Sequence, residues 1–238
     1  MLKPTVPTAA GAPRLAGADT AALRARTLRQ RAVADARRAL VLEAARATFG
    51  ELGLDGASLR EIARRAGYTP GALYRYFRSK EEVYAALLGE SLDRLNACVG
   101  TAQAPPGTPA RAVAHATLRA KATAFFEFYR ERPRDLDLGF YLFHGTRPRG
   151  LTPVLNARLN ARLAQALEPA GAALRAAGLD AAQAHVEATA LFAHMVGLLL
   201  LGHTGRIRMF ELQPQALLER YVDALVARTR ARPARATA

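Results

Sequence analysis

The chain has 238 residues, of which half are apolar and 23% are charged, so it can bury a core and is not disordered throughout. Its one cysteine, Cys98, excludes a disulfide framework and a cysteine-based zinc site and favours a reducing, cytoplasmic location. The net charge of +14 lies mostly at the two ends; this favours a polyanionic partner, although 31 arginines against three lysines also fit a compositional bias.

Residues 1–36 are predicted to form a disordered basic arm. The first 30 residues are rich in Ala, Pro, Gly and Thr and show no sustained apolar period. Pro4 and Pro7 follow Lys3 where a secretory signal would have an apolar stretch, so a signal peptide is not expected. At the other end, residues 229–238 are predicted to be a second disordered basic tail.

Two helices are predicted next. From residue 37 an apolar stripe runs at helical spacing through Val41, Ala45 and Phe49 and stops at Gly53. Ser58 and Glu61 then form a capping box that opens a short second helix, which Gly67 closes.

A third and a fourth helix follow at once. Thr69 is the expected N-cap of the third helix, with Pro70 at its first helical position. Ser79 and Glu82 form another capping box at the start of a long fourth helix that ends near residue 99.

The rest of the chain also repeats with the helical period and never with the period of a strand. After a break at residues 100–109, helices are predicted at 109–132, 135–144, 153–177 with a kink or split at Pro169, 180–201 and 214–228. The predicted fold class is therefore all-α.

Residues 58–77 carry the main functional signal. Ala63, Gly67 and Leu73 stand at the spacing of a helix-turn-helix, in which a small residue, a turn glycine and a core leucine pack one helix across another. The outer face of the third helix can then enter a major groove. Lys80 is predicted to contact a phosphate, since a cation in the first turn of a helix opposes the helix dipole and lysine is rare in this chain.

These residues resemble the DNA-binding domain of the TetR family of bacterial transcriptional regulators. The resemblance rests on Val41–Ala45, Phe49, Gly53, Ser58–Ala63, Gly67, Gly71–Phe77 and Ser79–Glu81. It implies a homodimer that binds a palindromic operator, usually as a repressor, and that a small molecule in the C-terminal core releases. The implied DNA-binding residues are Ser58, Arg60, Thr69, Pro70, Gly71, Ala72, Tyr74, Arg75, Tyr76 and Lys80.

Three positions depart from the family pattern: Leu52, Tyr68 and Tyr76. The neighbouring Arg64 and Arg65 are interpreted as solvated surface. The expected domains are a helix-turn-helix domain at 37–97, with its motif at about 60–79, and a helical effector-binding and dimerisation domain at 98–228.

No enzyme chemistry is predicted. The five histidines are scattered without metal-ligand spacing, and the chain has no nucleophile elbow or phosphate-binding loop. No catalytic residue, metal or cofactor is therefore expected.

The C-terminal helices offer an unspecific ligand pocket. Its predicted lining is Phe125, Phe126, Tyr129, Phe140, Tyr141 and Phe143, with polar groups from His144, Asn156, Asn160 or His194. An apolar or amphipathic effector fits this lining. The alternative is that the aromatic residues only pack the core, in a dimeric DNA-binding or scaffolding protein that senses no ligand.

The last two helices are predicted to form the dimer interface. The best membrane candidate, residues 188–202, is too short to span a bilayer and is interpreted as a buried helix. Two such helices from each chain would make a four-helix bundle, with contacts from Leu191, Met195, Leu198, Leu218, Tyr221, Val222 and Leu225.

Overall fold

A computed structural model describes residues 15–140 and 151–231, and these residues form helices without any strand. The all-α prediction is confirmed for them. The elements are α1 (Leu15–Gly56), α2 (Leu59–Arg65), α3 (Pro70–Leu73), α4 (Lys80–Thr101), η1 (Ala110–Ala112), α5 (Val113–Glu131), α6 (Pro133–Gly139), α7 (Pro153–Ala176), α8 (Ala181–His203), η2 (Arg206–Phe210) and α9 (Pro214–Ala231).

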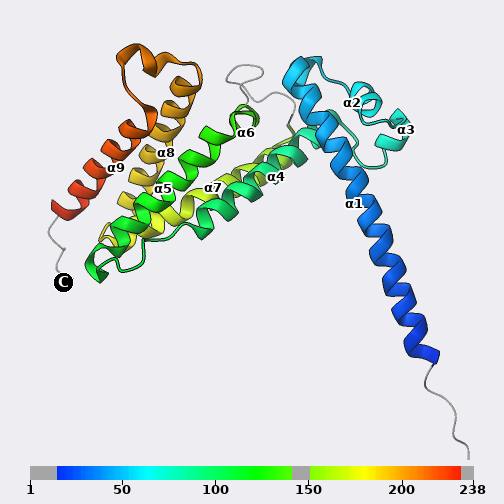
Figure 1. Ribbon diagram of the computed structural model, residues 1–238, viewed down its shortest axis with the longest axis horizontal. Helices are drawn as coiled ribbons and strands as arrows, with labels where there is room; N and C mark the ends of the chain where they lie inside the picture. Colours follow the sequence, from blue (N-terminus) through cyan, green and yellow to red (C-terminus); the bar gives the residue numbers. More distant parts are fainter. Residues whose placement is uncertain (1–14, 141–150, 232–238) are drawn as a thin grey trace, which may run out of the picture.

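The described chain has two helical parts joined by α4. The inner half of α1 packs with α2 and α3 at one end, and α4 leads from there into a bundle with α5, α7, α8 and α9 (Figure 1). Because α4 packs against α1 near its start and against α5 and α7 along its length, one rigid element spans the predicted boundary at 97/98.

The small N-terminal core forms where apolar faces of α1, α2 and α3 meet. Ala45, Ile62 and Leu73 are completely or almost completely buried there. The ring of Phe49 meets Tyr84 of α4 edge-on, with ring centroids 5.8 Å apart. The apolar stripe predicted for the first helix is therefore the face that holds the domain on α4.

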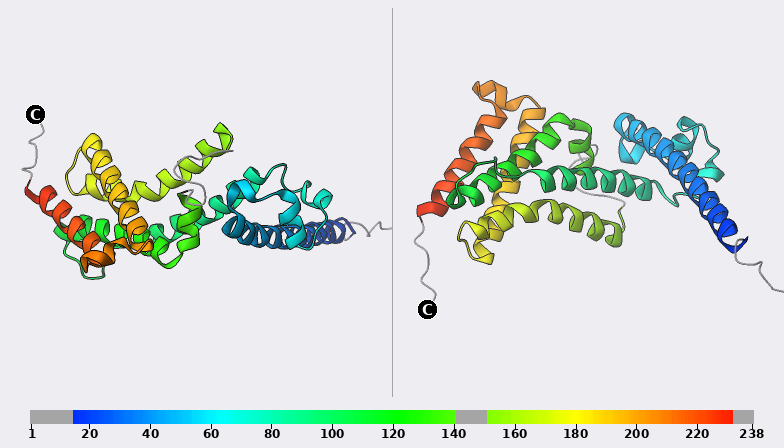
Figure 2. Two further views of the ribbon diagram at one scale, coloured as in Figure 1. Left: turned by 90° about the horizontal axis from the view of Figure 1, so that it is seen from above. Right: turned by 60° about the horizontal axis from the view of Figure 1, so that its bottom comes forward.

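The outer half of α1 corrects the prediction of a disordered arm. Residues 15–36 belong to the helix, which runs out from the molecule as a single rod (Figures 1 and 2). Alanine, arginine and leucine fill this stretch, and all three favour helix strongly even without an apolar face. The part of the predicted arm at 1–14 lies outside the described residues.

Two C-terminal predictions also change. Residues 229–231, predicted as part of a disordered tail, belong to α9, and Thr229 is buried against His115 of α5 with 2.9 Å between the hydroxyl and Nε2. The helix α7 runs through Pro169 without a split. The helix predicted at 135–144 begins earlier, at Pro133, and its described part ends at Gly139.

Candidate nucleic-acid interface

The turn between α2 and α3 is fixed by one glycine and two backbone hydrogen bonds. Gly67 has a φ of +73°, and no atom lies within 4 Å of the place that a Cβ would take. The backbone angle, not crowding, therefore requires glycine here. The N–H of Gly67 donates to Arg64 at 3.2 Å and that of Tyr68 donates to Ala63 at 2.9 Å, which closes α2.

Each helix that follows a turn in this domain has the predicted N-cap. In every case the side-chain oxygen of the cap accepts the backbone N–H three residues later, which satisfies a donor that the helix itself leaves free. The pairs are Ser58 with Glu61 at 3.1 Å, Thr69 with Ala72 at 3.3 Å, and Ser79 with Glu82 at 3.2 Å.

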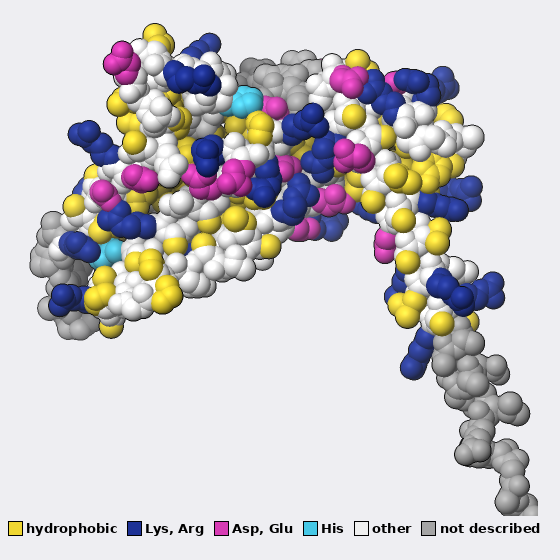
Figure 3. Space-filling model, viewed as in Figure 1, with side chains coloured by type: hydrophobic (Ala, Val, Ile, Leu, Met, Phe, Trp, Pro, Cys, Tyr) yellow, Lys and Arg dark blue, Asp and Glu magenta, His cyan; other side chains and the backbone are white. Residues whose placement is uncertain are grey.

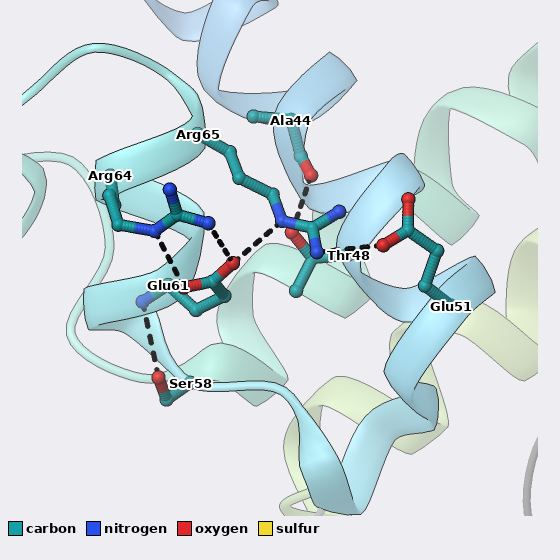
Figure 4. Close-up of polar contacts among 7 residues, drawn as sticks. All are labelled: Ala44, Thr48, Glu51, Ser58, Glu61, Arg64 and Arg65. Atoms are coloured by element: carbon teal, nitrogen blue, oxygen red, sulfur yellow. Dashed lines mark hydrogen bonds and ion pairs between the residues drawn. The ribbon is translucent and has the colours of Figure 1, made fainter.

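Ionic contacts hold α2 against α1 (Figure 4). The carboxylate of Glu61 accepts from Arg64 at 2.7 Å and from Arg65 at 2.8 Å, and Arg65 also reaches Glu51 of α1 at 2.7 Å. Hydrogen bonds from Arg64 and Arg65 hold the pKa of Glu61 at about 2. The prediction of a solvated side chain suits Arg64, which is 72% exposed, but is wrong for Arg65, which bridges the two helices.

The candidate DNA-binding residues are presented on the open side of α2 and α3. Ser58, Arg60, Thr69, Pro70, Gly71, Tyr74 and Arg75 are exposed, while Ala72 and Tyr76 are half-buried. The small Gly71 and Ala72 at the start of α3 leave room for close approach to a groove. Tyr68 and Tyr76, two of the departures from the family pattern, pack partly against the core, so their rings also serve the fold.

Lys80 has a different place from the one predicted. Its ammonium donates to the carbonyls of Leu54 at 2.7 Å, Asp55 at 3.2 Å and Ala57 at 3.3 Å, in the short turn that follows the break in α1 at Gly53, where φ is +68°. Lys121 likewise donates to carbonyls at the C-terminal end of α4. Both lysines thus bind the backbone of their own chain, because a compact ammonium with three donors suits several carbonyls at once.

Asp135 of α6 ties the two parts of the molecule together. Its carboxylate is buried and accepts from Arg94 of α4 at 2.9 Å and from Arg46 of α1 at 3.4 Å. The hydroxyl of Tyr84 in α4 donates to the carbonyl of Leu138 in α6. A shift of α6 would therefore disturb α1 and α4 directly. The sequence does not reveal this role, because an acid in the first turn of a helix also fits the helix dipole.

An aromatic cluster occupies the C-terminal domain where the ligand pocket was predicted. Phe125 meets Tyr129 and Phe192 edge-on at 5.3 Å and 5.9 Å between ring centroids, and Phe140 lies 5.6 Å from Tyr129. Burial raises the pKa of the Tyr129 hydroxyl, with Asp135 adding to the effect. Phe126 is buried beside the cluster. Phe192 was not predicted, since its helix looked uniformly apolar.

Two cavities flank Tyr129. One, of about 220 Å³, is lined by Phe126, Tyr129, Leu198 and residues of η2. The other, of about 30 Å³, lies between Tyr129, Phe140 and Asn160. These volumes are smaller than the few hundred Å³ that a drug-sized ligand usually occupies.

Several predicted pocket residues lie elsewhere or cannot be placed. His194 stacks on Tyr221 of α9, with ring centroids 4.1 Å apart. It stands two residues from Phe192 on α8, which puts it on another side of that helix. Asn156 is half-buried on α7. Tyr141, Phe143 and His144 lie outside the described residues.

The predicted dimer contacts are corrected by the structure. Leu191, Met195, Leu198, Leu218, Val222 and Leu225 are all buried within the single chain, and Tyr221 is half-buried. They pack α8 and α9 against their own bundle, so they are not free to meet a partner. The reason is that residues 191–201 of α8 are apolar nearly all round, and the sequence does not show which side faces its own chain.

The other side of α8 is apolar and uncovered. The α8 stripe, as we call it, consists of Ala182, Val186, Ala190, Ala193, Gly197 and Leu201, which recur at helical spacing and of which only Gly197 is not exposed. By length and composition α8 could cross a membrane, with a mean hydropathy of 1.6 over 18 residues, and only 28% of that window is buried. The prediction of a buried helix is therefore wrong for the isolated chain.

Taken together, these elements define a helix-turn-helix DNA-binding domain joined by a long helix to a helical bundle. Residues 41–87 match the family model described as bacterial regulatory proteins, tetR family. The helix-turn-helix domain is therefore of the TetR type. The resemblance identified in the sequence is thus confirmed.

Curated relatives match this chain over part of their length. The transcriptional activator FasR of Mycolicibacterium smegmatis is 36% identical over 114 residues, which are 48% of this chain and 50% of FasR. The transcriptional repressor KstR2 of Mycobacterium tuberculosis is 46% identical over 61 residues, which are 26% of this chain and 30% of KstR2. The chain thus spans half or less of the length of these curated relatives.

Solved structures share the fold over most of the chain. The TetR family regulator PfmR of Thermus thermophilus has a TM-score of 0.57 and 19% identity, covering 78% of this chain and 93% of its own. The regulator FadR of Bacillus subtilis, solved in complex with stearoyl-CoA, has a TM-score of 0.55 and 18% identity, covering 79% and 96%.

Proposed function

We propose that the protein is a cytoplasmic, homodimeric transcriptional regulator that binds a palindromic operator and changes its DNA affinity when a small apolar or amphipathic molecule binds the C-terminal domain. The observation that carries this proposal is the helix-turn-helix itself. Its caps, turn and core are complete, and the outer face of α3 is left open with Tyr74 and Arg75 exposed.

Dimerisation is supported by the uncovered α8 stripe. A continuous apolar face of this size is unusual on a monomeric protein and favours a partner. Small residues such as Ala190, Ala193 and Gly197 allow two helices to approach closely, and a second copy of α8 is their simplest occupant. A two-fold dimer also matches the symmetry of a palindromic site.

An effector is supported by the aromatic cluster and the cavities on either side of Tyr129. An apolar chain could enter between Phe125, Phe140 and Phe192 by displacing the ring contacts that Phe192 makes, edge-on with Phe125 and tilted with Phe140. The acyl-CoA bound by FadR of Bacillus subtilis makes this chemical class a sensible first probe. Any movement of α6 on binding would reach α1 and α4 through Asp135.

The test begins with selection of a DNA site from random duplexes by the full chain. We expect one palindrome to be enriched. Arg75→Ala should then relax the base preference at one position by about 1–3 kcal/mol, whereas Tyr74→Phe should weaken specific and non-specific binding together, because a phosphate contact carries little sequence information.

Fluorescence anisotropy on the selected operator, with and without stearoyl-CoA, tests the effector. A fall in operator affinity at micromolar acyl-CoA supports the proposal. An operator that binds tightly and is unaffected by acyl-CoA or by other amphipathic molecules supports the alternative, a DNA-binding protein that senses no ligand. Enrichment of no sequence at all would overturn the regulator function.

A further inference from the structure

The outer half of α1 is a basic rod without packing partners of its own. Every residue from 23 to 37 is exposed. Residues 23–38 contain six arginines and one acid, Asp35, so this short stretch carries a net charge of +5. Within the described residues, Arg24, Arg26, Arg29 and Arg31 make no ion pair that would neutralise them.

This rod leaves the domain beside the recognition helix. The guanidinium of Arg38 lies over the ring of Phe77, 4.8 Å from its centroid, and Phe77 comes four residues after the end of α3. From that point α1 points away from the C-terminal bundle in every view (Figures 1 and 2). Lys and Arg side chains are prominent along it (Figure 3). A duplex that occupies α3 is therefore close to the start of the rod.

The rod is not part of the domain that the family shares. The family model begins at residue 41, and the buried face of α1 begins at the same residue, Val41. Apart from Arg38, whose guanidinium covers the ring of Phe77, the arginines before it contribute nothing to the helix-turn-helix core. Their positive charges repel one another, and no packing contact in the exposed part of the helix offsets this repulsion. An anionic partner would therefore stabilise them.

We propose that residues 23–38 bind the phosphate backbone of the DNA that flanks the operator. This inference rests on the proposed operator binding. The stretch is about 24 Å long at the rise of a helix, which corresponds to roughly seven base pairs. Its arginines would therefore extend the contact on each side of a palindrome beyond the bases that α3 can reach.

An anionic membrane surface is a poorer partner for the same charges. A helix that lies on a membrane needs one continuous apolar face. The large exposed apolar residues here are Leu23, Leu28 and Val33, and steps of five residues turn each of them about 140° from the one before. The one uncharged face holds Leu28 and three alanines at helical spacing, a small apolar surface for a membrane, whereas the arginines on both sides of it suit phosphates.

The experiment compares two duplexes and three full-length proteins. One duplex carries only the selected operator, and the other carries the operator with about ten further base pairs on each side, roughly one turn of DNA. The proteins are the natural chain, the quadruple variant R24Q/R26Q/R29Q/R31Q, and the matched control R24K/R26K/R29K/R31K. Glutamine and lysine both favour helix, so the variants change charge and not helicity, which circular dichroism checks.

We expect the Gln variant to bind the flanked duplex at least tenfold more weakly than the natural chain at 0.1 M salt. The slope of log K against log salt should fall by about 0.9 for each phosphate that the variant no longer neutralises. The Lys variant should keep the affinity and the slope, and all three proteins should bind the short duplex alike.

Equal affinity and equal slope for the natural chain and the Gln variant on the flanked duplex would overturn the inference, including a case in which only anionic phosphatidylglycerol vesicles distinguish them. An equal loss on both duplexes would overturn it too, because the arginines would then act within the operator. Failure of the proposed function looks different: none of the three proteins would bind either duplex specifically.

Discussion

The two halves of this molecule are stabilised by opposite kinds of chemistry. The DNA-binding domain is small and depends on polar groups placed one by one, such as the three N-caps, the Glu61–Arg65 contact and the ammonium of Lys80. The C-terminal domain depends on apolar burial, with rings such as Phe125 packed edge-on and an α8 whose second half is apolar nearly all round.

This difference explains what each half can do. Directional hydrogen bonds fix the angle between α2 and α3, which a helix needs if it is to enter a groove in one orientation. Apolar contacts are not directional, so the bundle can open around a ligand or pack against another copy at modest cost. The link between them is again polar: Asp135 joins α6 to Arg46 and Arg94.

The largest expected effect comes from a charge placed on the exposed apolar surface of the C-terminal domain. Ala193→Glu places a charge in the centre of the α8 stripe, where a partner helix would bury it unpaired at a cost of about 3–5 kcal/mol per copy. We expect sedimentation equilibrium to show folded monomers and operator affinity to fall by at least a hundredfold.

The matched control is Ala164→Glu, which places the same charge at an exposed position on α7 and should leave the dimer intact. Leu198→Glu, by contrast, puts a charge into the core of the protomer and should unfold it. A variant Ala193→Glu that stays dimeric would show that the α8 stripe is not the interface.

The next largest effect comes from removing a polar contact in the DNA-binding domain. Lys80→Met keeps the aliphatic part of the side chain but leaves the three carbonyls of the turn after Gly53 without this donor. The free energy of unfolding should fall by about 1–3 kcal/mol, measured by urea denaturation. The salt slope of DNA binding should stay the same.

The opposite result would support the phosphate contact that the sequence predicts for Lys80. Unchanged stability, together with a salt slope lower by about one unit, would mean that Lys80 leaves the carbonyls and contacts a phosphate in the complex. Lys121→Met serves as the comparison, because Lys121 caps α4 far from the predicted DNA face and should lower stability alone.

The contrast between the halves also decides what the sequence can predict. Caps, turn glycines and apolar spacing act between neighbours in the chain, so the roles of Ser58, Gly67 and Thr69 can be predicted from the residues around them. The all-α class follows from the same local periods. The outer half of α1 escapes prediction because it has no apolar period, and helix propensity alone holds it.

Contacts between helices that lie far apart in the chain cannot be predicted from this sequence. Nothing local tells which side of a uniformly apolar helix faces its own chain, so the prediction of Leu198 and Val222 as interface residues is wrong. Nor does spacing show that Arg65 reaches back to Glu51, or that Phe192 joins Phe125. Those contacts depend on how helices far apart in the chain pack.

The smallest expected effect is a loss of stability at mildly acidic pH in the C-terminal domain alone. Burial, with a further contribution from Arg230 and Arg119, lowers the pKa of His115 in α5 below its ordinary value of 6.5. Thr229 donates its hydroxyl to the carbonyl of Val226 at 2.8 Å, so the Nε2 of His115 donates to Thr229. Because its pKa is lowered, the ring is neutral at pH 7.

Because folding lowers the pKa of His115, the stability of the C-terminal domain should fall as the pH drops from 7.5 to 5.5. The stability of the DNA-binding domain should not change over this range. The unfolded chain binds a proton on His115 below pH 6.5 that the folded state resists, so the contribution of His115 to the stability of the C-terminal domain is complete above pH 6.5 and declines below it. The lowered pKa of Glu61, about 2, keeps the contacts of the DNA-binding domain until the pH falls from 4.5 towards 2.

Hydrogen exchange, measured separately on peptides from α5 with α9 and from α2 with α3, should show faster exchange at pH 5.5 only in the first set, after correction for intrinsic rates. His115→Gln, which retains a donor for Thr229, should remove much of this dependence. The remainder should come from His194, whose pKa burial also lowers, and an equal loss of protection in both sets would contradict the assignment.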